Sequence, residues 1–247
     1  MRIDRFYLPQ SIHGDSVTVT DERLLHQWKS VLRAKPGFEL VLFDGSGAEY
    51  GAVIQEMRSG EAVLSITDKH HEDDTAPAVW LYAALIKRDK FEWIIEKATE
   101  LGVAGIVPLA ADRSDKKNIV YERAQKIIVE AAEQSGRVRL PEIAPIQTVD
   151  EALDHLSTLD GVADSYMFDK DAGVSTLGAD TPDLCAQLRQ PGRAGEYVRL
   201  FVGPEGGWSD REKGVFQEKG VRQYSLGKQN LKTETAAICV AGLALVG

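Results

Sequence analysis

Residues 198–212, VRLFVGPEGGWSDRE, decide the fold of this chain. The apolar run 198–202 is typical of a buried strand, and a loop with three glycines and a proline follows it directly. Ser209 and Glu212 then form a capping-box pattern, so we predict that a helix begins there. Such a loop often only joins two elements, but it is also a setting in which backbone groups hold a small ligand.

A second glycine-bearing loop, 226–232 (LGKQNLK), follows a short predicted strand at 221–226. Residues 233–246 after it are almost wholly apolar and rich in alanine, which predicts a helix buried around most of its circumference. This segment is too short to span a bilayer. Two such loops at the ends of successive strands predict a cofactor pocket at the carboxyl edge of an open α/β sheet.

Alternating strand and helix patterns from residue 79 onward predict a parallel α/β sheet. Helical spacing of apolar residues predicts a helix that begins near Phe91 and ends at Gly102, and another that begins at Tyr121. Thr148 and Glu151 open a third helix with another capping box. The remaining predicted elements are strands at 79–86, 103–109 and 162–168 and a short helix near 182–189.

The amino-terminal part, residues 1–72, predicts a small and mostly antiparallel β domain, interrupted by one helix that Asp21 caps and that carries apolar residues between 24 and 32. Its strands are predicted at 16–20, 38–43, 49–56 and 62–67. The polar run 70–77, HHEDDTAP, is the predicted linker. His70 and His71 are adjacent rather than at helical or hairpin spacing, so we predict no metal site.

The charge of the chain disfavours indiscriminate nucleic-acid binding, because 29 Lys and Arg stand against 38 Asp and Glu and give a net charge of −9. Two small basic clusters are present, one at Lys29, Arg33 and Lys35 and one at residues 87–90. Each is either a solvated face or a contact to a defined, structured RNA.

Composition also limits the compartment and the chemistry. The two cysteines, Cys185 and Cys239, are far apart, so no disulfide framework is indicated and we expect a reducing cytoplasm. The amino terminus has no apolar signal core. The sequence shows no Walker pattern, no dinucleotide fingerprint and no Ser-His-Asp arrangement, which disfavours NTPase, dehydrogenase and hydrolase activities.

The segments GPEGGWSDRE (203–212) and LGKQNLKTETA (226–236) together resemble the carboxy-terminal signature of the ribosomal RNA small-subunit methyltransferase E family, part of the SPOUT superfamily of knotted enzymes. Segments 87–103, 130–141, 2–6 and 26–33 also resemble this family, so the similarity runs through the whole chain. One loop departs from the family pattern LG-x-R-I-L-R: Gln229 and Lys232 occupy the two arginine positions, and Asn230 replaces an aliphatic residue.

The resemblance implies an α/β fold with two domains. Residues 73–247 would form a SPOUT-type methyltransferase domain whose parallel sheet contains a trefoil knot, and residues 1–72 a PUA-like RNA-binding β-barrel. The knotted part would bind S-adenosylmethionine and form a homodimer interface. The implied reaction is methylation at N3 of a uridine in the decoding region of 16S rRNA. The implied partner is this RNA within the small ribosomal subunit, in the cytoplasm and away from membranes.

Matching positions imply roles for individual residues. The implied cofactor-binding residues are Phe168, Val202, Gly203, Gly207, Leu226, Gly227 and Leu231. The catalytic candidates are Glu205, Glu234 and Lys232, although a carboxylate in a loop or in the first turn of a helix also has purely structural uses. The RNA-binding candidates are Arg5, Trp28, Arg33, Arg88 and Arg137, with a core position as the alternative for Trp28 and pairing across a dimer interface for an arginine.

Two other functions stay open at this point. One is a knotted methyltransferase that acts on transfer RNA or on a ribose hydroxyl. The other is a non-catalytic RNA-binding factor in ribosome assembly that has lost activity through its altered LG loop.

Overall fold

The chain folds into two compact units in the computed structural model, which describes residues 3–72, 78–114, 118–154, 163–170 and 197–246. The first unit comprises residues 1–73 together with 132–140, and the second comprises 74–131 together with 141–247. The sequence pattern gives no sign that segment 132–140 belongs with the amino-terminal part of the chain.

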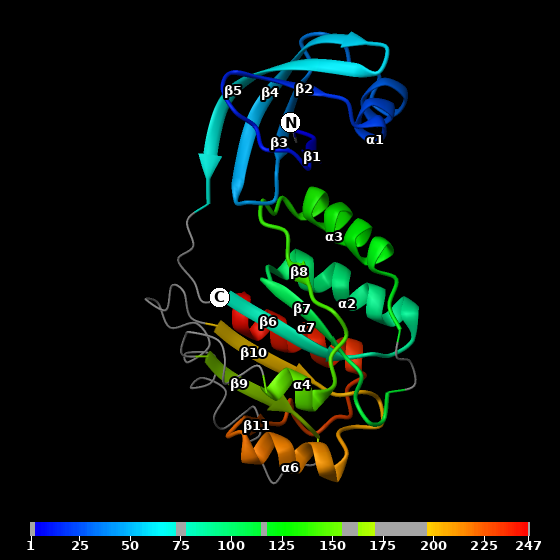
Figure 1. Cartoon of the computed structure of the whole chain (residues 1–247), viewed down its shortest axis with the longest axis vertical. Helices are drawn as coiled ribbons and strands as arrows, with labels where there is room; N and C mark the ends of the chain where they lie inside the picture. Colours follow the sequence, from blue (N-terminus) through cyan, green and yellow to red (C-terminus); the bar gives the residue numbers. More distant parts are fainter. Residues whose placement is uncertain (1–2, 73–77, 115–117, 155–162, 171–196, 247) are drawn as a thin grey trace. The chain divides into compact units, whose positions relative to one another are not determined.

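The first unit is built on a five-stranded sheet in the order β1-β3-β4-β5-β2 (Figure 1). The strands are β1 (Arg5–Tyr7), β2 (Ser16–Val19), β3 (Glu39–Phe43), β4 (Ala48–Arg58) and β5 (Glu61–His71). All neighbours are antiparallel except β1 and β3, which are parallel. β1 is only three residues long, too short for a periodic pattern to predict it.

The predicted linker begins too early. His70 and His71 belong to β5, where they pair with Glu49 and Ala48 of β4. Backbone pairing in a long hairpin therefore outweighs the polar composition of this run. Of the predicted linker, residues 73–77 lie outside the described part of the chain.

The helix of the first unit begins as predicted and then changes its winding. Asp21 caps α1 (Glu22–His26) by accepting a hydrogen bond from the Leu24 N–H at 2.9 Å. The chain continues as a π-helical turn, η1 (Gln27–Val31), with more residues per turn than an α-helix. The predicted α-helical spacing therefore fails at Val31, which is 66% exposed, whereas Trp28 is fully buried.

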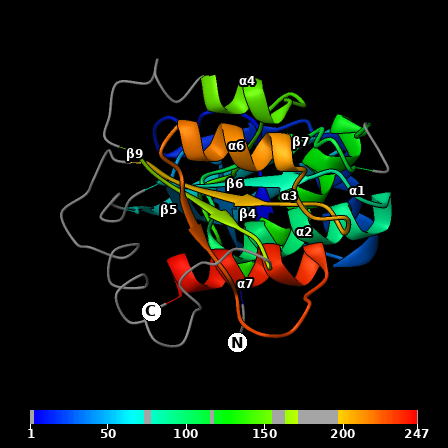
Figure 2. The ribbon, with the colours of Figure 1, turned by 90° about the horizontal axis from the view of Figure 1, so that it is seen from below.

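The second unit contains a six-stranded parallel sheet in the order β11-β9-β10-β6-β7-β8, which confirms the predicted α/β class. Its strands are β6 (Ala78–Ala84), β7 (Gly105–Leu109), β8 (Glu142–Ile143), β9 (Ala163–Phe168), β10 (Tyr197–Val202) and β11 (Arg222–Tyr224). Its helices are α2 (Arg88–Leu101), α3 (Tyr121–Ser135, of which 132–135 belong to the first unit), α4 (Val149–Asp154), α6 (Asp210–Glu218) and α7 (Thr233–Leu245). Figure 2 shows α4 and α6 on one face of the sheet and α2 and α7 on the other.

The helix end predicted at Gly102 and the two predicted capping boxes are confirmed, whereas α2 begins at Arg88, three residues before Phe91 (91 − 88). Gly102 ends α2 in the left-handed conformation, at a φ of 105°. Both capping boxes form, since the Glu151 carboxylate accepts from the Thr148 N–H at 2.8 Å and the Ser209–Glu212 pair is reciprocal. The short helix predicted near 182–189 lies outside the described residues.

The sheet positions the site because its strands are parallel. β9, β10 and β11 all end at the same edge, so the segments that follow Phe168, Val202 and Tyr224 lie near one another. The trefoil knot and the PUA-like barrel remain predictions.

Candidate functional site

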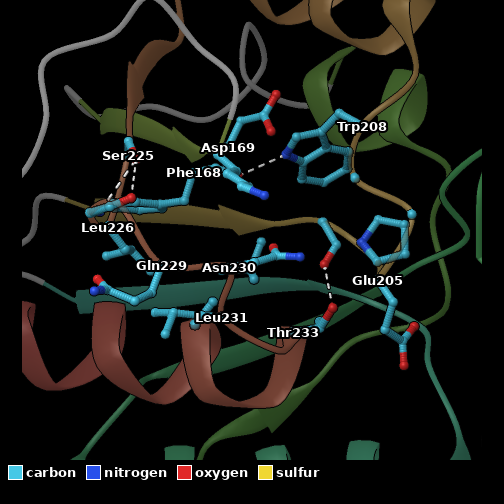
Figure 3. A pocket seen from close by; sticks show the side chains of 18 residues that line it. Phe168, Asp169, Glu205, Trp208, Ser225, Leu226, Gln229, Asn230, Leu231 and Thr233 are labelled. Carbon is cyan, nitrogen blue, oxygen red and sulfur yellow. Dashed lines mark hydrogen bonds between the residues drawn. The ribbon is translucent and has the colours of Figure 1, made fainter.

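A cleft of about 230 Å³ lies at this edge of the sheet (Figure 3). One wall is the GPEGG loop, residues 203–207, and the other is the LG loop, residues 226–231. All seven residues that the sequence analysis assigns to a cofactor line this cleft: Phe168, Val202, Gly203, Gly207, Leu226, Gly227 and Leu231. The tertiary structure therefore brings together groups from three strand ends that are up to 63 residues apart in the chain (231 − 168).

The GPEGG loop has a fixed shape because three of its carbonyl groups accept hydrogen bonds. The Thr233 hydroxyl donates to the Gly203 carbonyl at 2.9 Å, and the Gly207 N–H donates to the Pro204 carbonyl at 2.9 Å. The Arg113 guanidinium donates to the Gly206 carbonyl at 2.9 Å. The loop is thus held from within and from two other segments of the second unit.

Glycine is required at the start of this loop by its closeness to a rigid side chain. A Cβ atom at Gly203 would lie 3.0 Å from the indole of Trp208. That indole is 1% exposed, packs against Phe216, and donates from Nε1 to the Phe168 carbonyl at 3.1 Å. Because the ring has little room to move, the backbone rather than side chains forms this wall of the cleft.

The turn after β7 braces the start of α6. The Asp112 carboxylate accepts from the Ser209 hydroxyl at 2.5 Å and from two nitrogens of Arg211 at 2.9 and 3.1 Å. The Asp112 N–H in turn donates to the buried Glu212 carboxylate at 2.9 Å. Asp112 and Arg113 were not predicted as site residues, although they lie in the loop after a parallel strand, where ligands usually bind.

The LG loop is held by fewer contacts. Within the described part of the chain, its hydrogen bonds to a side chain come from Ser225, whose hydroxyl bonds the Gly227 carbonyl at 3.2 Å and the Gly227 N–H at 3.3 Å. Gly227 has a φ of 128°, which favours glycine. Figure 3 shows Asn230 between the two loops and Gln229 pointing away from the GPEGG loop.

The three catalytic candidates occupy different environments. Glu205 lines the cleft, is exposed, and points outward at its rim in Figure 3. Lys232 is exposed at the N-cap of α7, and Glu234 is 6% exposed in the first turn of that helix. Neither Lys232 nor Glu234 lines the cleft, so the structure does not gather the three around one point.

One acidic residue in the cleft was missed by the sequence analysis. Asp169 follows β9 directly, lines the cleft, and forms an ion pair with Lys213 of α6 at 2.5 Å. Its position right after Phe168 was the available signal, because the strand end itself was identified.

The RNA-binding candidates are also placed differently from one another. Arg33 and Arg88 are exposed, and Arg33 has a left-handed backbone with a φ of 52°. Arg5 forms an ion pair with Glu49 at 2.5 Å. Burial lowers the pKa of Arg137 to about 10, which the nearby Glu72 carboxylate opposes and Arg139 reinforces.

Trp28 is corrected from a candidate RNA contact to a core residue. Its side chain is fully buried and meets Phe6 edge to face, with ring centroids 5.6 Å apart. An indole without exposed surface offers no face on which a base could stack. The alternative that the sequence analysis left open for Trp28 is therefore the correct one.

The described residues offer neither a metal site nor a membrane-spanning helix. No group of three or more His, Cys, Asp or Glu side chains in this part of the chain is arranged to hold a metal ion. None of the helices described there is both long and apolar enough to cross a membrane.

The sequence of this chain is similar to those of known RNA methyltransferases. Residues 74–245 match the RNA methyltransferase domain family. A ribosomal RNA small subunit methyltransferase E from Synechocystis sp. is 34% identical over 236 residues, which cover 92% of this chain and 72% of the relative.

Two solved structures are similar over nearly the whole chain at 27% identity. One is a ribosomal RNA small subunit methyltransferase E from Neisseria gonorrhoeae bound to S-adenosyl methionine, with a TM-score of 0.80 and coverage of 98% of this chain and 96% of that one. The other is a putative methyltransferase from Legionella pneumophila in complex with the same cofactor, with a TM-score of 0.79 and coverage of 99% and 97%.

Proposed function

Since this chain belongs to the ribosomal RNA small subunit methyltransferase E family, we propose that it methylates N3 of a uridine in the decoding region of 16S rRNA, with S-adenosylmethionine as the methyl donor. The observation that carries this proposal is the convergence of all seven implied cofactor residues on one cleft. Two structurally similar proteins were solved with this cofactor bound, which supports the same choice here.

The residues of the cleft fit such a cofactor. Two glycine-bearing loops present backbone groups, which can bond the edge of an adenine and the ribose, while Phe168, Leu226 and Leu231 offer apolar surface. When bound, S-adenosylmethionine supplies a methyl group on a positively charged sulfur. The walls of the cleft would orient that methyl group toward the incoming base, and positioning of this kind supplies much of the rate of a transfer reaction.

The N3 atom of uridine carries a proton that must leave before or during methyl transfer. Glu205 is the best-supported acceptor of the three candidates, because it lines the cleft and is exposed to an incoming base. Glu234 is buried outside the cleft lining, which favours a structural role in the first turn of α7. Lys232 is exposed next to the LG loop and could contact an RNA phosphate.

RNA contacts are assigned to the exposed basic residues. Lys29, Arg33 and Lys35 are all exposed in the first unit, which we propose to be a PUA-like RNA-binding domain, and Arg88 is exposed in the second. The target base has to be unpaired or extruded for its N3 atom to reach the cleft. An acidic chain with small basic clusters is suited to one structured target, here the small ribosomal subunit in the cytoplasm.

The last helix supports a homodimer built around a knotted carboxy-terminal segment. α7 carries apolar residues all round, and Cys239 on its outer side is exposed in the single chain. An apolar helix surface that one chain leaves uncovered is suited to pair with a second copy. Sedimentation of the purified protein measures its oligomeric state, and a monomer would contradict this proposal.

The function is tested by binding and then by transfer. Calorimetry should detect S-adenosylmethionine binding to the purified chain. Small subunits from cells that lack the enzyme should then gain one methyl group at N3 of a single uridine in 16S rRNA, located by mapping the modified nucleotide.

The same two measurements separate the alternatives. Binding followed by methylation of a transfer RNA or of a ribose hydroxyl would identify a different knotted methyltransferase. Absence of cofactor binding would overturn both enzymatic assignments and leave a non-catalytic RNA-binding assembly factor.

A further inference from the structure

We propose that Thr233 and Arg113 are positioning residues that hold the GPEGG loop in the shape that binds the cofactor. This inference rests on the proposed function, because it concerns the same cleft. Its basis is that two carbonyl groups of one short loop are each bonded by a side chain from a distant part of the sequence.

Thr233 ties the GPEGG loop to the segment that follows the LG loop. It is the first residue of α7 and is 3% exposed, and its hydroxyl donates to the Gly203 carbonyl at 2.9 Å. A hydroxyl has one proton to donate. Because the hydroxyl donates to the Gly203 carbonyl, the bond links the GPEGG loop to the start of α7 and leaves this hydroxyl no proton to donate to a ligand.

Arg113 holds the same loop from outside the cleft. Its guanidinium donates to the Gly206 carbonyl at 2.9 Å, and its aliphatic stem lies against Gly206, where an added Cβ would be 3.2 Å from the Arg113 Cβ. Arg113 does not line the cleft. Any effect of Arg113 on cofactor affinity must therefore act through the loop.

The turn that carries Arg113 is itself anchored. Asp112 is bonded by Ser209 and Arg211, so the Arg113 backbone starts from a fixed point. The loop between Gly203 and Gly206 is thus fixed at both ends before any ligand arrives, which lowers the ordering cost of binding.

Loss of either bond should let the loop adopt other shapes, so that only part of the population is ready to bind. The affinity for the cofactor would then fall by the fraction of the population that is lost. Once the cofactor is bound the loop is back in place, so the transfer step at saturation should be unchanged. The expected kinetic signature is a raised KM for S-adenosylmethionine with an unaltered kcat.

The test compares matched variants by calorimetry with S-adenosylmethionine and by initial rates of transfer to small subunits. Thr233→Val keeps the shape and removes the hydroxyl, while Thr233→Ser keeps the hydroxyl. Arg113→Met keeps the stem and removes the guanidinium, while Arg113→Lys keeps one donor. We expect Thr233→Val and Arg113→Met to weaken binding by about two- to tenfold, the effect of one hydrogen bond, and Thr233→Ser to stay within about twofold of wild type.

A double variant separates positioning from direct contact. If both side chains act through one loop, the second loss adds little, and Thr233→Val with Arg113→Met should weaken binding by clearly less than the product of the single effects. The proposal would be overturned if the loss of affinity in the double variant equalled the product of the two single losses. It would also be overturned if both single variants bound with wild-type affinity, or if kcat at saturating cofactor fell.

Two controls keep the test decisive. If Thr233→Val fails to fold, the exposed Arg113 still carries the comparison through its Met and Lys variants. If the wild-type chain binds no S-adenosylmethionine, the proposed function fails together with this inference, whereas normal wild-type binding with unaffected variants overturns this inference alone.

Discussion

The two walls of the cleft are both glycine-bearing loops at strand ends, but they are held very differently. The GPEGG loop is bonded by side chains from α7 and from the turn after β7, and it runs into a capping box with a fully buried carboxylate at Glu212. Among the described residues, the only side chain that bonds the LG loop is that of Ser225, through longer hydrogen bonds. Glycine content alone therefore does not tell whether a loop is rigid.

The difference indicates that the two walls contribute to ligand binding in different ways. A loop with its carbonyl groups already bonded presents a constant surface, which suits the part of a ligand that never varies. A loop with few bonds can adjust to its ligand at a modest cost. The family pattern changes in this second wall, at Gln229 and Asn230, and at Lys232 directly after it, and all three residues are exposed.

The largest expected effect comes from removing the rigid support of the GPEGG loop. Trp208→Ala should lower the free energy of unfolding by about 3–5 kcal/mol, because it leaves a cavity beside Phe216 and removes the bond to the Phe168 carbonyl. Urea denaturation measures this loss. Trp208→Phe, which keeps a ring, should cost clearly less, and a loss below about 1 kcal/mol for Trp208→Ala would show that this wall is not rigidly supported.

High pH should weaken β9 and its pairing with β11, the strand that leads into the LG loop. Burial, assisted by Asp164, raises the pKa of Tyr166 to about 12, while the Arg222 guanidinium that bonds the hydroxyl at 2.9 Å opposes this shift. The unfolded chain loses that proton near its ordinary pKa of about 10, so the stability contributed by the neutral phenol is present below pH 10 and is lost as the pH rises toward 12.

The expected loss over this window is at most about 3 kcal/mol, because a pKa difference of one between the folded and unfolded chain corresponds to about 1.4 kcal/mol and the difference here is about two. Tyr166→Phe is the matched control, because it keeps the ring and cannot ionise. Hydrogen exchange should show β11 and the LG loop opening before the GPEGG loop does. An identical pH profile in the control would contradict this prediction.

Two alanine substitutions compare the walls directly. Gly207 in the GPEGG loop has a φ of 66°, and Gly227 in the LG loop has a φ of 128°, so alanine is strained at both positions. Gly207→Ala should cost about 1 kcal/mol of stability, since its loop is held in place. Gly227→Ala should cost less, because its loop can relax, but should weaken cofactor binding several-fold. A larger loss of stability for Gly227→Ala than for Gly207→Ala would contradict the difference in rigidity between the two loops.

The smallest effect is expected where the chain departs from its family. Gln229→Arg combined with Lys232→Arg restores both arginines, and both positions are exposed, the first in the loosely held wall and the second at the N-cap of α7. Exposed substitutions of this kind usually change free energies by no more than about 0.5 kcal/mol, so the rate of transfer to small subunits should stay within about twofold of wild type. A large gain in rate would show that this wall has lost a substrate contact.

Local features of this protein could be predicted from its sequence. The apolar strand before Gly203, the capping box at Ser209 and Glu212, and the helix end at Gly102 all depend on residues that are neighbours in the chain. Periodicity and capping act over one or two turns, which is why they can be identified without a structure.

The tertiary structure alone decided which distant residues meet. It buried Trp28, paired His70 with Glu49 in a hairpin, joined 132–140 to the first unit, and brought Arg113 to Gly206 across 93 residues. Burial and long-range hydrogen bonds depend on how whole elements pack against one another. No local pattern encodes that packing, because the same short sequence can lie in a core or on a surface according to what covers it.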